Sequence, residues 1–468
     1  MRINSNLFKN ISYSFTANIT SMLISVLMII FMPKILEVQD YSIWQLYAFY
    51  SSYLGFFHFG WLDGIYLRYG GYEFEKLNKL KFSNQLYSLF LFEVIITVIL
   101  LSYIYFELAD LLQKEILIFV SLLLLPVILY TFSSFILQIT NRIKEYAKLI
   151  LFERLTFVFF VALYLVCGFR SYIGLLYIDL FGKILAMLFG IYLIKGILVF
   201  NFTKFADIIA EIYENINVGS KLLFANIASM LILGIIRFGI SQYWNVVTFG
   251  KISLALSIAN FLMVFINAVS VVLFPALKRV ADNELKIVYQ KIDIVLTVIL
   301  LGALALYYPL KYILNWWLPQ YGDSLMYVSI LFPICFFESK VVLLINTYLK
   351  TLRQEALLLK VNFVTVALSA LLTYFCVVYL HNLQFTVFSI LVLFLFKYSI
   401  SKYFLMKKLQ ISDSFNELVL IFAFVAINSL QFNLFYSFGS YLFLFVMYLL
   451  FSKAKIKNCL HLFREDLA

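Results

Sequence analysis

A carboxylate and an ammonium group lie one helical turn apart in an otherwise apolar stretch, YIDLFGKILAM at residues 177–187. Asp179 and Lys183 share a helix face at a spacing of four, with the acid on the N-terminal side, the more favourable order for an ion pair. Two interpretations stay open. The pair is either structural and neutralises itself, or it lines an aqueous cavity and opens when an anion or a proton arrives.

Other ionisable residues also fall inside apolar runs. An ionisable group at the bilayer centre costs about 2.5–3.5 kcal/mol on insertion scales, so each must face protein, water or a counter-ion. Glu338 and Lys340 are two residues apart and point to different helix faces, so they cannot simply neutralise each other. The cations are Arg154, Lys183, Arg237, Lys340 and Lys397, and the anions are Glu93, Glu153, Asp179, Asp293 and Glu338.

Depth in the membrane separates these groups. Lys183, Lys340 and Lys397 lie too deep for easy snorkelling, whereas Arg154 and Arg237 are close enough to a span end to reach an interface. We expect Asp293, near the inner interface, to be an ordinary surface charge. Because cations occur in both halves of the chain, we predict a positive chamber that attracts a multiply charged anion such as a pyrophosphate.

The elements that must position these groups are transmembrane helices. The 468 residues are 64% hydrophobic and 13% charged, with a mean hydropathy of +0.96, whereas a soluble domain carries about 25% charged residues. Apolar runs of about 20 residues recur, each long enough to span a bilayer as a helix. We predict an all-α polytopic membrane protein with fourteen spans: 11–32, 42–60, 86–106, 116–138, 149–169, 172–194, 218–238, 248–275, 290–314, 325–349, 360–380, 383–404, 417–435 and 437–452.

The loops that join the predicted spans are alternately rich and poor in lysine and arginine. Cation-rich connections face the cytoplasm in bacterial inner-membrane proteins, so the pattern predicts an inner-membrane location with both termini cytoplasmic. The net charge of +11 therefore marks the cytoplasmic face, and we expect no nucleic-acid partner. The cation-rich connections hold Arg68, Lys76, Lys79 and Lys81; Arg142, Lys144 and Lys148; Lys278, Arg279, Lys286 and Lys291; Lys350, Arg353 and Lys360; and Lys402, Lys407 and Lys408.

The spans predict two six-helix lobes with two helices added. Residues 1–200 form the first lobe and 218–405 the second, and 406–468 hold the two added helices and a basic cytoplasmic tail. Between the lobes, 201–217 reads as an amphipathic helix on the inner surface. The stretches VQDYSIWQLYAFYSSYLGFF and WNVVTFGKISLALSIANFL, after the first and seventh spans, resemble each other. Internal repeats of this kind are typical of transporters.

Motifs for catalysis are missing from the sequence. There is no HExxH pair, and His58, His381 and His461 are scattered, so we expect no metal and no cofactor. Gly250-Lys251 lacks the other residues of a phosphate-binding loop. No predicted external loop is large enough for a glycosyltransferase or polymerase site, so we expect a protein that is not an enzyme.

The chain resembles the oligosaccharide flippases of bacterial polysaccharide synthesis, the exporters of O-antigen and capsule repeat units in the multidrug/oligosaccharidyl-lipid/polysaccharide (MOP) superfamily. The resemblance lies in NLFKNISYSFTANI, MPKILEVQDYSIWQLY, FGWLDGIYLRYGGYE, WNVVTFGKISLALSI and FPALKRV. It implies a two-lobed bundle that moves an undecaprenyl-diphosphate-linked oligosaccharide to the periplasmic leaflet by alternating access, for O-antigen, lipopolysaccharide or capsule synthesis.

The resemblance also implies roles for the intramembrane charges. Lys183, Arg154, Arg237, Lys340 and Lys397 would line the cationic cavity, and Asp179, Glu93 or Glu338 would carry a coupling proton or sodium ion. Membrane lipids and other polysaccharide-assembly proteins are the remaining expected partners. Two transporter alternatives stay open, a cation-coupled multidrug exporter and a lipid II flippase. A membrane glycosyltransferase or polysaccharide polymerase is the alternative outside transport.

Overall fold

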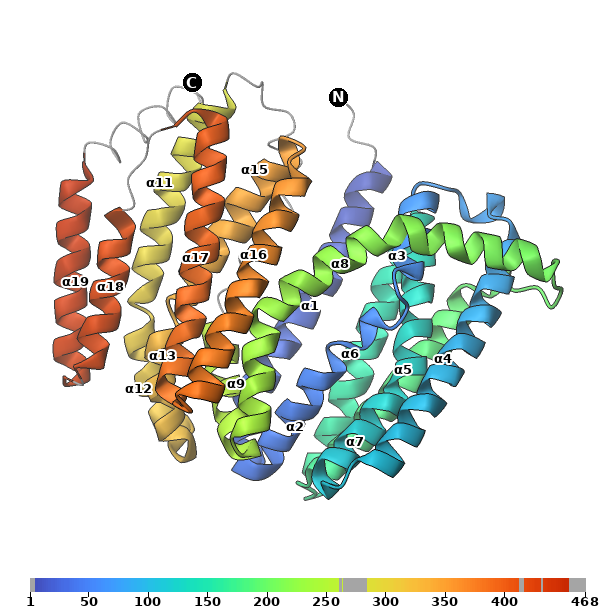
Figure 1. Cartoon of the computed structure of the whole chain (residues 1–468), viewed down its shortest axis with the longest axis horizontal. Helices are drawn as coiled ribbons and strands as arrows, with labels where there is room; N and C mark the ends of the chain where they lie inside the picture. The colour runs from blue at the N-terminus through green and yellow to red at the C-terminus, as the bar shows by residue number, and fades with distance from the viewer. Residues whose placement is uncertain (1–4, 261–262, 264–283, 412–415, 431, 454–468) are drawn as a thin grey trace. The chain divides into compact units, whose positions relative to one another are not determined.

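The computed structural model describes residues 5–260, 263, 284–411, 416–430 and 432–453. Within these residues the chain is almost entirely helical and contains no strand, which confirms the predicted all-α membrane fold. The chain divides into two compact units, Met1–Ile227 and Ala228–Ala468. Figure 1 shows the first from blue to green and the second from green to red.

Unit 1 is built around one central helix, α5, which is mostly buried between α4 on one side and α7 on the other. Helix α6 packs on α7 and on α1, and α2 packs on α5. Its helices are α1 (Ser5–Ile35), α2 (Val38–Ser51), α3 (Trp61–Tyr69), α4 (Lys79–Glu107), α5 (Leu111–Ile139), α6 (Ile143–Val166), α7 (Tyr172–Leu193) and the first part of α8 (Phe205–Tyr243).

Unit 2 has α17 near its centre, in contact with α13, α14 and α16, and its last two helices pack on each other. Its helices after α8 are α9 (Val246–Ala259), α11 (Leu285–Leu304), α12 (Tyr307–Trp317), α13 (Gly322–Leu331), α14 (Ile334–Ser339), α15 (Asn346–Thr351), α16 (Glu355–Thr373), α17 (Leu383–Leu409), α18 (Asn416–Ser429) and α19 (Leu434–Phe451). Two short π-helical turns, Lys340–Ile345 and Tyr374–Tyr379, interrupt this set.

Short polar side chains begin many of these helices. Asn78 accepts a hydrogen bond from the Lys81 amide at the start of α4, and Asp110 accepts two from the first turn of α5. Such caps satisfy amide groups that have no partner inside the helix. Asn245, Asn382 and Asn433 cap α9, α17 and α19 in the same way. The sequence therefore marks where spans begin as well as how long they are.

Each of the fourteen predicted spans coincides with one or more helices over most of the residues that the structure describes. Ten helices of the described residues are long and apolar enough to cross a membrane. The number is eleven if α13 with α14–α15, which are bent by 45° beside Pro333, count as one broken span. The eighth and thirteenth predicted spans begin with the shorter apolar helices α9 and α18. The rest of the eighth span, the FPALKRV motif and the basic tail from residue 454 onward lie outside the described residues.

The second predicted span, 42–60, is a helix with a break. Helix α2 ends at Ser51, a 3₁₀ turn covers Leu54–Phe56, and α3 begins at Trp61. Phe59 and Gly60 just before α3 both have positive φ, 52° and 86°. Glycine adopts this conformation at low cost, which lets the chain turn sharply inside an apolar stretch.

The predicted linker 201–217 and the predicted span 218–238 share one continuous helix, α8. Its first part crosses α3 at very short range (Figure 1). A Cβ atom added to Gly64 would lie 1.9 Å from the Asn215 carbonyl oxygen, and one added to Gly219 would lie 2.0 Å from that of Gly60. Only glycine fits this crossing, because any side chain would overlap the opposing backbone.

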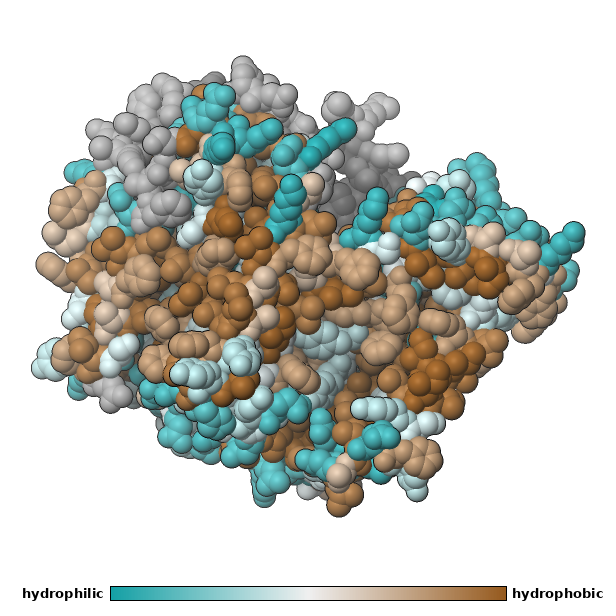
Figure 2. Space-filling view, in the orientation of Figure 1, coloured by the Kyte–Doolittle hydropathy of each residue, from teal (hydrophilic) through white to brown (hydrophobic). Residues whose placement is uncertain are grey.

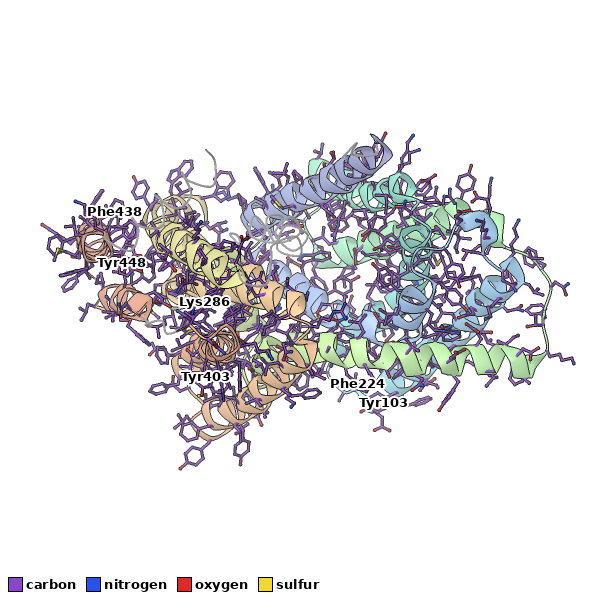
Figure 3. All side chains as sticks on the ribbon, turned by 90° about the horizontal axis from the view of Figure 1, so that it is seen from above. Tyr103, Phe224, Lys286, Tyr403, Phe438 and Tyr448 are labelled. Carbon is purple, nitrogen blue, oxygen red and sulfur yellow. The ribbon has the colours of Figure 1, made fainter. Side chains whose placement is uncertain are left out.

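Apolar side chains cover the visible helix flanks, and hydrophilic residues gather toward the helix ends (Figure 2). Aromatic residues such as Tyr103 on α4 and Tyr403 on α17 project outward from their helices (Figure 3) and are more than half exposed. Such a band is the surface that a bilayer would cover.

Candidate functional site

The central charges of unit 1 form a network across four helices. Lys183 of α7 donates a hydrogen bond to the carboxylate of Glu153 on α6. The hydroxyl of Tyr130 on α5 lies within hydrogen-bonding reach of the same carboxylate. Glu153 is therefore held from two neighbouring helices, and its side chain is only 9% exposed.

Asp179 has a different partner from the one that its spacing predicts. The hydroxyl of Tyr47 on α2 donates to Asp179 over 2.8 Å, while Lys183 bonds across to Glu153. The two residues stay close enough to interact electrostatically. The predicted pair within α7 is thus part of a larger arrangement in which each member is fixed by another helix.

Arg154 is the exposed cation of this network, which we call the open network because one of its cations has no described partner. It follows Glu153 on α6, its side chain is exposed, and its charge acts on both Glu153 and Asp179. None of the described residues forms an ion pair or hydrogen bond with its guanidinium. Lys183 is 24% exposed. Arg154 and Lys183 are therefore the two cations of this network that keep accessible surface.

Glu93 on α4 is the most isolated carboxyl of unit 1. Its side chain is 0% exposed, and neither carboxyl oxygen has a hydrogen-bond partner among the described residues. A buried carboxyl without partners is costly, so its retention is a candidate functional feature. The structure brings no described cation to it.

The two predicted cavity lysines of unit 2, Lys340 and Lys397, are each bound in a closed pair. The Lys340 ammonium is 0% exposed and donates to the Asp293 backbone oxygen, to its carboxylate and to the Thr297 hydroxyl at 2.5–2.8 Å. All three donor positions of the ammonium are thus used. The expectation that Asp293 is a surface charge is wrong, because it is 8% exposed and faces this lysine.

Lys397 and Glu338 form a second closed pair. The Lys397 ammonium lies 3.1 and 3.0 Å from the two carboxylate oxygens of Glu338, and Lys397 is 5% exposed. Glu338 and Lys340 do point to different partners, in agreement with their spacing. The consequence is two separate pairs rather than one shared group of open charges.

A third pair in unit 2 was missed by the sequence reasoning. Lys402 on α17 donates to Glu417 on α18 over 2.8 Å, and the Tyr398 hydroxyl donates to the same carboxylate over 2.6 Å. Both charged residues are buried, although Lys402 counts among the predicted cytoplasmic cations. The sequence gives one indication of this pair. Glu417 is the first residue of a predicted span, where a carboxylate without a partner costs free energy.

Arg237, the remaining predicted cavity cation, lies on α8. Its guanidinium donates to the Ser253 hydroxyl of α9 over 3.0 Å and lies 5.2 Å from the centre of the Phe249 ring. This environment is polar on one side and aromatic on the other, and Arg237 is half-buried.

A further ionic cluster joins α8 to α3 and α4. Arg68 pairs with Glu211 at 2.7 Å and with Glu214 at 2.5 Å, and Lys81 pairs with Glu211 at 2.5 Å. The Tyr69 hydroxyl donates to Glu211 over 2.6 Å. Burial and this carboxylate raise the pKa of Tyr69. The cluster fixes the first part of α8 on unit 1.

Among the described residues no group of three or more His, Cys, Asp or Glu side chains could hold a metal ion. The groups that the described part of unit 1 brings together are two cations, Arg154 and Lys183, and two carboxyl groups, Glu153 and Asp179.

No protein-family model matches the sequence, and no curated protein matches it significantly. Solved structures do match the fold. A structure of the lipid II flippase MurJ, in an inward closed conformation, superimposes with a TM-score of 0.63 at 12% identity, covering 98% of this chain and 99% of that one. The fold is that of MurJ.

Transporters of the MOP superfamily share this fold. An inward-facing multidrug resistance MATE family transporter gives a TM-score of 0.61 at 12% identity, covering 84% of this chain and 98% of its own. An outward-facing one gives 0.54 at 13%, covering 86% and 95%. This chain therefore has a transporter and flippase fold, and the structures named here are not of enzymes.

Proposed function

We propose that this protein is a flippase that moves an undecaprenyl-diphosphate-linked oligosaccharide from the cytoplasmic to the periplasmic leaflet by alternating access, for O-antigen or capsule synthesis. The observation that carries the proposal is the exposed Arg154 beside the Lys183–Glu153 pair on membrane-spanning helices of unit 1. Two cations that both act on Glu153 suit a diphosphate, whose oxygens accept strong charge-assisted hydrogen bonds.

The fold is compatible with three kinds of cargo. The flippase structure covers 98% of this chain and the inward-facing multidrug transporter covers 84%. A lipid II flippase and a multidrug exporter therefore remain the alternatives to the proposed function.

In the proposed mechanism the diphosphate binds Arg154 first and then takes Lys183 from Glu153. The freed Glu153 keeps its Tyr130 partner, which limits the cost of losing the lysine. The lipid tail stays in the bilayer throughout. Asp179, Glu93 and Glu338 remain the proposed coupling groups for a proton or sodium ion. Lys340 and Lys397 are fully engaged in unit 2, so we assign them no contact with the headgroup, and Arg237 remains a predicted contact.

Complementation tests the proposal. The chain is expressed in a strain that lacks its oligosaccharide flippase, with Lys183→Ala and Lys183→Arg as variants and membrane levels measured alongside. We expect surface glycan to return with the native chain, to be lost with alanine and to be partly kept with arginine. If alanine exports as well as the native chain, Lys183 is not a headgroup ligand.

Two further strains separate the alternatives. A strain depleted of its lipid II flippase keeps growing only if the chain moves lipid II, which carries the same diphosphate and lipid tail. A drug-sensitive strain gains resistance only if the chain exports drugs. Restored growth or resistance without restored surface glycan would replace the proposed substrate with the corresponding alternative.

A further inference from the structure

The first part of α8 has one polar face, and that face is turned toward unit 1. Glu211, Asn215 and Gly219 recur at intervals of four residues, lie on one side of the helix and are buried. Asn215 accepts a hydrogen bond from Arg68 over 2.5 Å and donates one to Gln85 of α4 over 2.8 Å. Together with the Arg68–Glu211 pair, these bonds fix the rotation of the helix about its own axis.

A second face of the same helix carries an exposed apolar stripe. Phe205, Ile209 and Tyr213 also recur at intervals of four residues, and they are 77%, 48% and 71% exposed. Asp207 lies across the helix from Phe205 and is exposed as well. The helix thus has three sides: one against protein, one aromatic and uncovered, and one acidic and uncovered.

The segment before α8 continues the aromatic side. Its backbone is held by α4, because the Ser83 hydroxyl donates to the Ile197 oxygen over 2.7 Å and accepts from the Val199 amide over 2.8 Å. Its aromatic side chains point outward: Phe200 is 90% and Phe202 is 67% exposed. Hydrogen bonds therefore hold one side of this segment to α4, and its aromatic side chains stay exposed on the other side, as they do on α8.

This aromatic surface is continuous with the exposed flank of α4. The ring of Tyr87 on α4 lies 5.7 Å from Phe200 and 5.8 Å from Phe202. Farther along α4, Leu91, Ile95 and other apolar residues are exposed on the flank that the span presents to lipid. The surface therefore begins in the lipid-facing band of a span and ends on α8.

Cations surround the same end of unit 1. Lys79 at the start of α4, Lys195 and Lys204 are all exposed. Basic residues next to an aromatic stripe are what an anionic leaflet attracts, since aromatic rings settle at the headgroup level and lysines bind the acidic lipids.

We propose that Phe200, Phe202, Phe205, Ile209 and Tyr213 form a lipid-binding strip that lies in the anionic cytoplasmic surface of the membrane. The strip holds the start of α8 at the membrane surface while the Arg68–Glu211 cluster holds it to unit 1. Its occupant is the phospholipid itself, and the strip acts whatever substrate the protein transports.

Photo-crosslinking tests the strip directly. The photoreactive residue p-benzoylphenylalanine replaces Phe205 or Tyr213, both aromatic already, and replaces Asp207 as the matched control on the same helix. Each full-length variant is reconstituted in liposomes of phosphatidylethanolamine and phosphatidylglycerol, irradiated and weighed intact by mass spectrometry. Elution as a monodisperse peak before reconstitution shows that a variant is folded.

We expect several-fold more lipid adduct at positions 205 and 213 than at 207. Adducts no more frequent than at 207 would overturn the proposal, and so would crosslinks to a second copy or to an added cytoplasmic extract in place of lipid. The cations predict adducts enriched in phosphatidylglycerol, and Lys204→Glu should reduce that enrichment. Equal labelling of both lipids contradicts the anionic preference. The lipid crosslinks are measured without any export of glycan, so their result does not depend on whether the proposed flippase function is correct.

Discussion

The two units differ in how the charged side chains on their membrane helices are paired and exposed. In unit 1 the network of Lys183, Glu153 and Asp179 is tied together by tyrosine hydroxyls and keeps the exposed Arg154 beside it. In unit 2 the ammonium groups of Lys340, Lys397 and Lys402 are buried, and each bonds to its own carboxylate. The comparison teaches that an intramembrane cation alone does not mark a ligand site. We therefore place the proposed ligand site at the cations whose partners leave them accessible.

Closed pairs of this kind hold helices together. Lys340 joins the π-helical turn to α11, Lys397 joins α17 to α14, and Lys402 joins α17 to α18. A buried ion pair is not by itself stabilising relative to apolar packing, but removing one partner leaves an uncompensated charge. We therefore expect substitutions of Lys340, Lys397 and Lys402 to act on stability and substitutions of Lys183 and Arg154 to act on transport.

The largest expected effect is on the stability of unit 2. Lys340→Met leaves the Asp293 carboxylate buried without its counter-charge, which should destabilise the protein by about 3–5 kcal/mol. A lower melting temperature of the purified protein in detergent checks this. The double variant with Asp293→Asn should recover much of the loss. The comparison fails if Lys183→Met, in the open network, lowers the melting temperature as much as Lys340→Met does.

Next comes the transport effect of the exposed cation. Arg154→Ala removes a charge-assisted hydrogen bond to the headgroup, worth about 1.5–3 kcal/mol, so export should fall about tenfold to a hundredfold. Surface glycan measured at equal membrane levels reports this. The melting temperature should stay near that of the native chain because Arg154 pairs with no described residue. A normal export rate would remove Arg154 from the proposed site.

Two tyrosines offer a matched and smaller test. Tyr47→Phe removes the donor to Asp179, and Tyr398→Phe removes the donor to Glu417, each at a cost of about 1 kcal/mol. We expect Tyr47→Phe to slow export several-fold and Tyr398→Phe to lower only the melting temperature. Export assays and thermal melts of both variants decide the point. The opposite assignment would show that the open network lies in unit 2.

The smallest effect on stability is expected at Glu93. Glutamine keeps the shape of this buried side chain and removes any charge that would lack a partner, so the melting temperature of Glu93→Gln should not fall. If Glu93 carries a coupling proton, export in this variant should no longer respond to a proton gradient in proteoliposomes. An unchanged response would leave Asp179 and Glu338 as the proposed coupling groups.

The sequence predicted the helices well because hydropathy and length are local properties of the chain. It also placed the intramembrane charges on spans correctly. It could not predict their partners, because Tyr47 of α2 and Glu153 of α6 bond to α7, and Tyr130 of α5 bonds to Glu153. The spacing of four favoured the pair within α7, since contacts between residues three or four apart on one helix can be predicted from the sequence, whereas contacts between helices cannot.

Two other differences have the same origin. The predicted boundary between linker and span at residue 217 lies inside α8, because a helix needs only its own backbone bonds to cross from one environment to another. Asp293 looks peripheral by its depth in the span. Its burial depends on Lys340, which lies 47 residues later in the chain. Tertiary pairing of this kind leaves no local signal.

The glycine crossing of α3 and α8 has a mechanical consequence. With only hydrogen atoms between the two backbones at Gly64 and Gly219, neither helix has side chains over which the other could roll. A rotation of the beginning of α8 about its axis would therefore move one backbone directly against the other, with no side chain between them to take up the displacement. Two missing methyl groups thus make the start of this 39-residue helix resist rotation against α3.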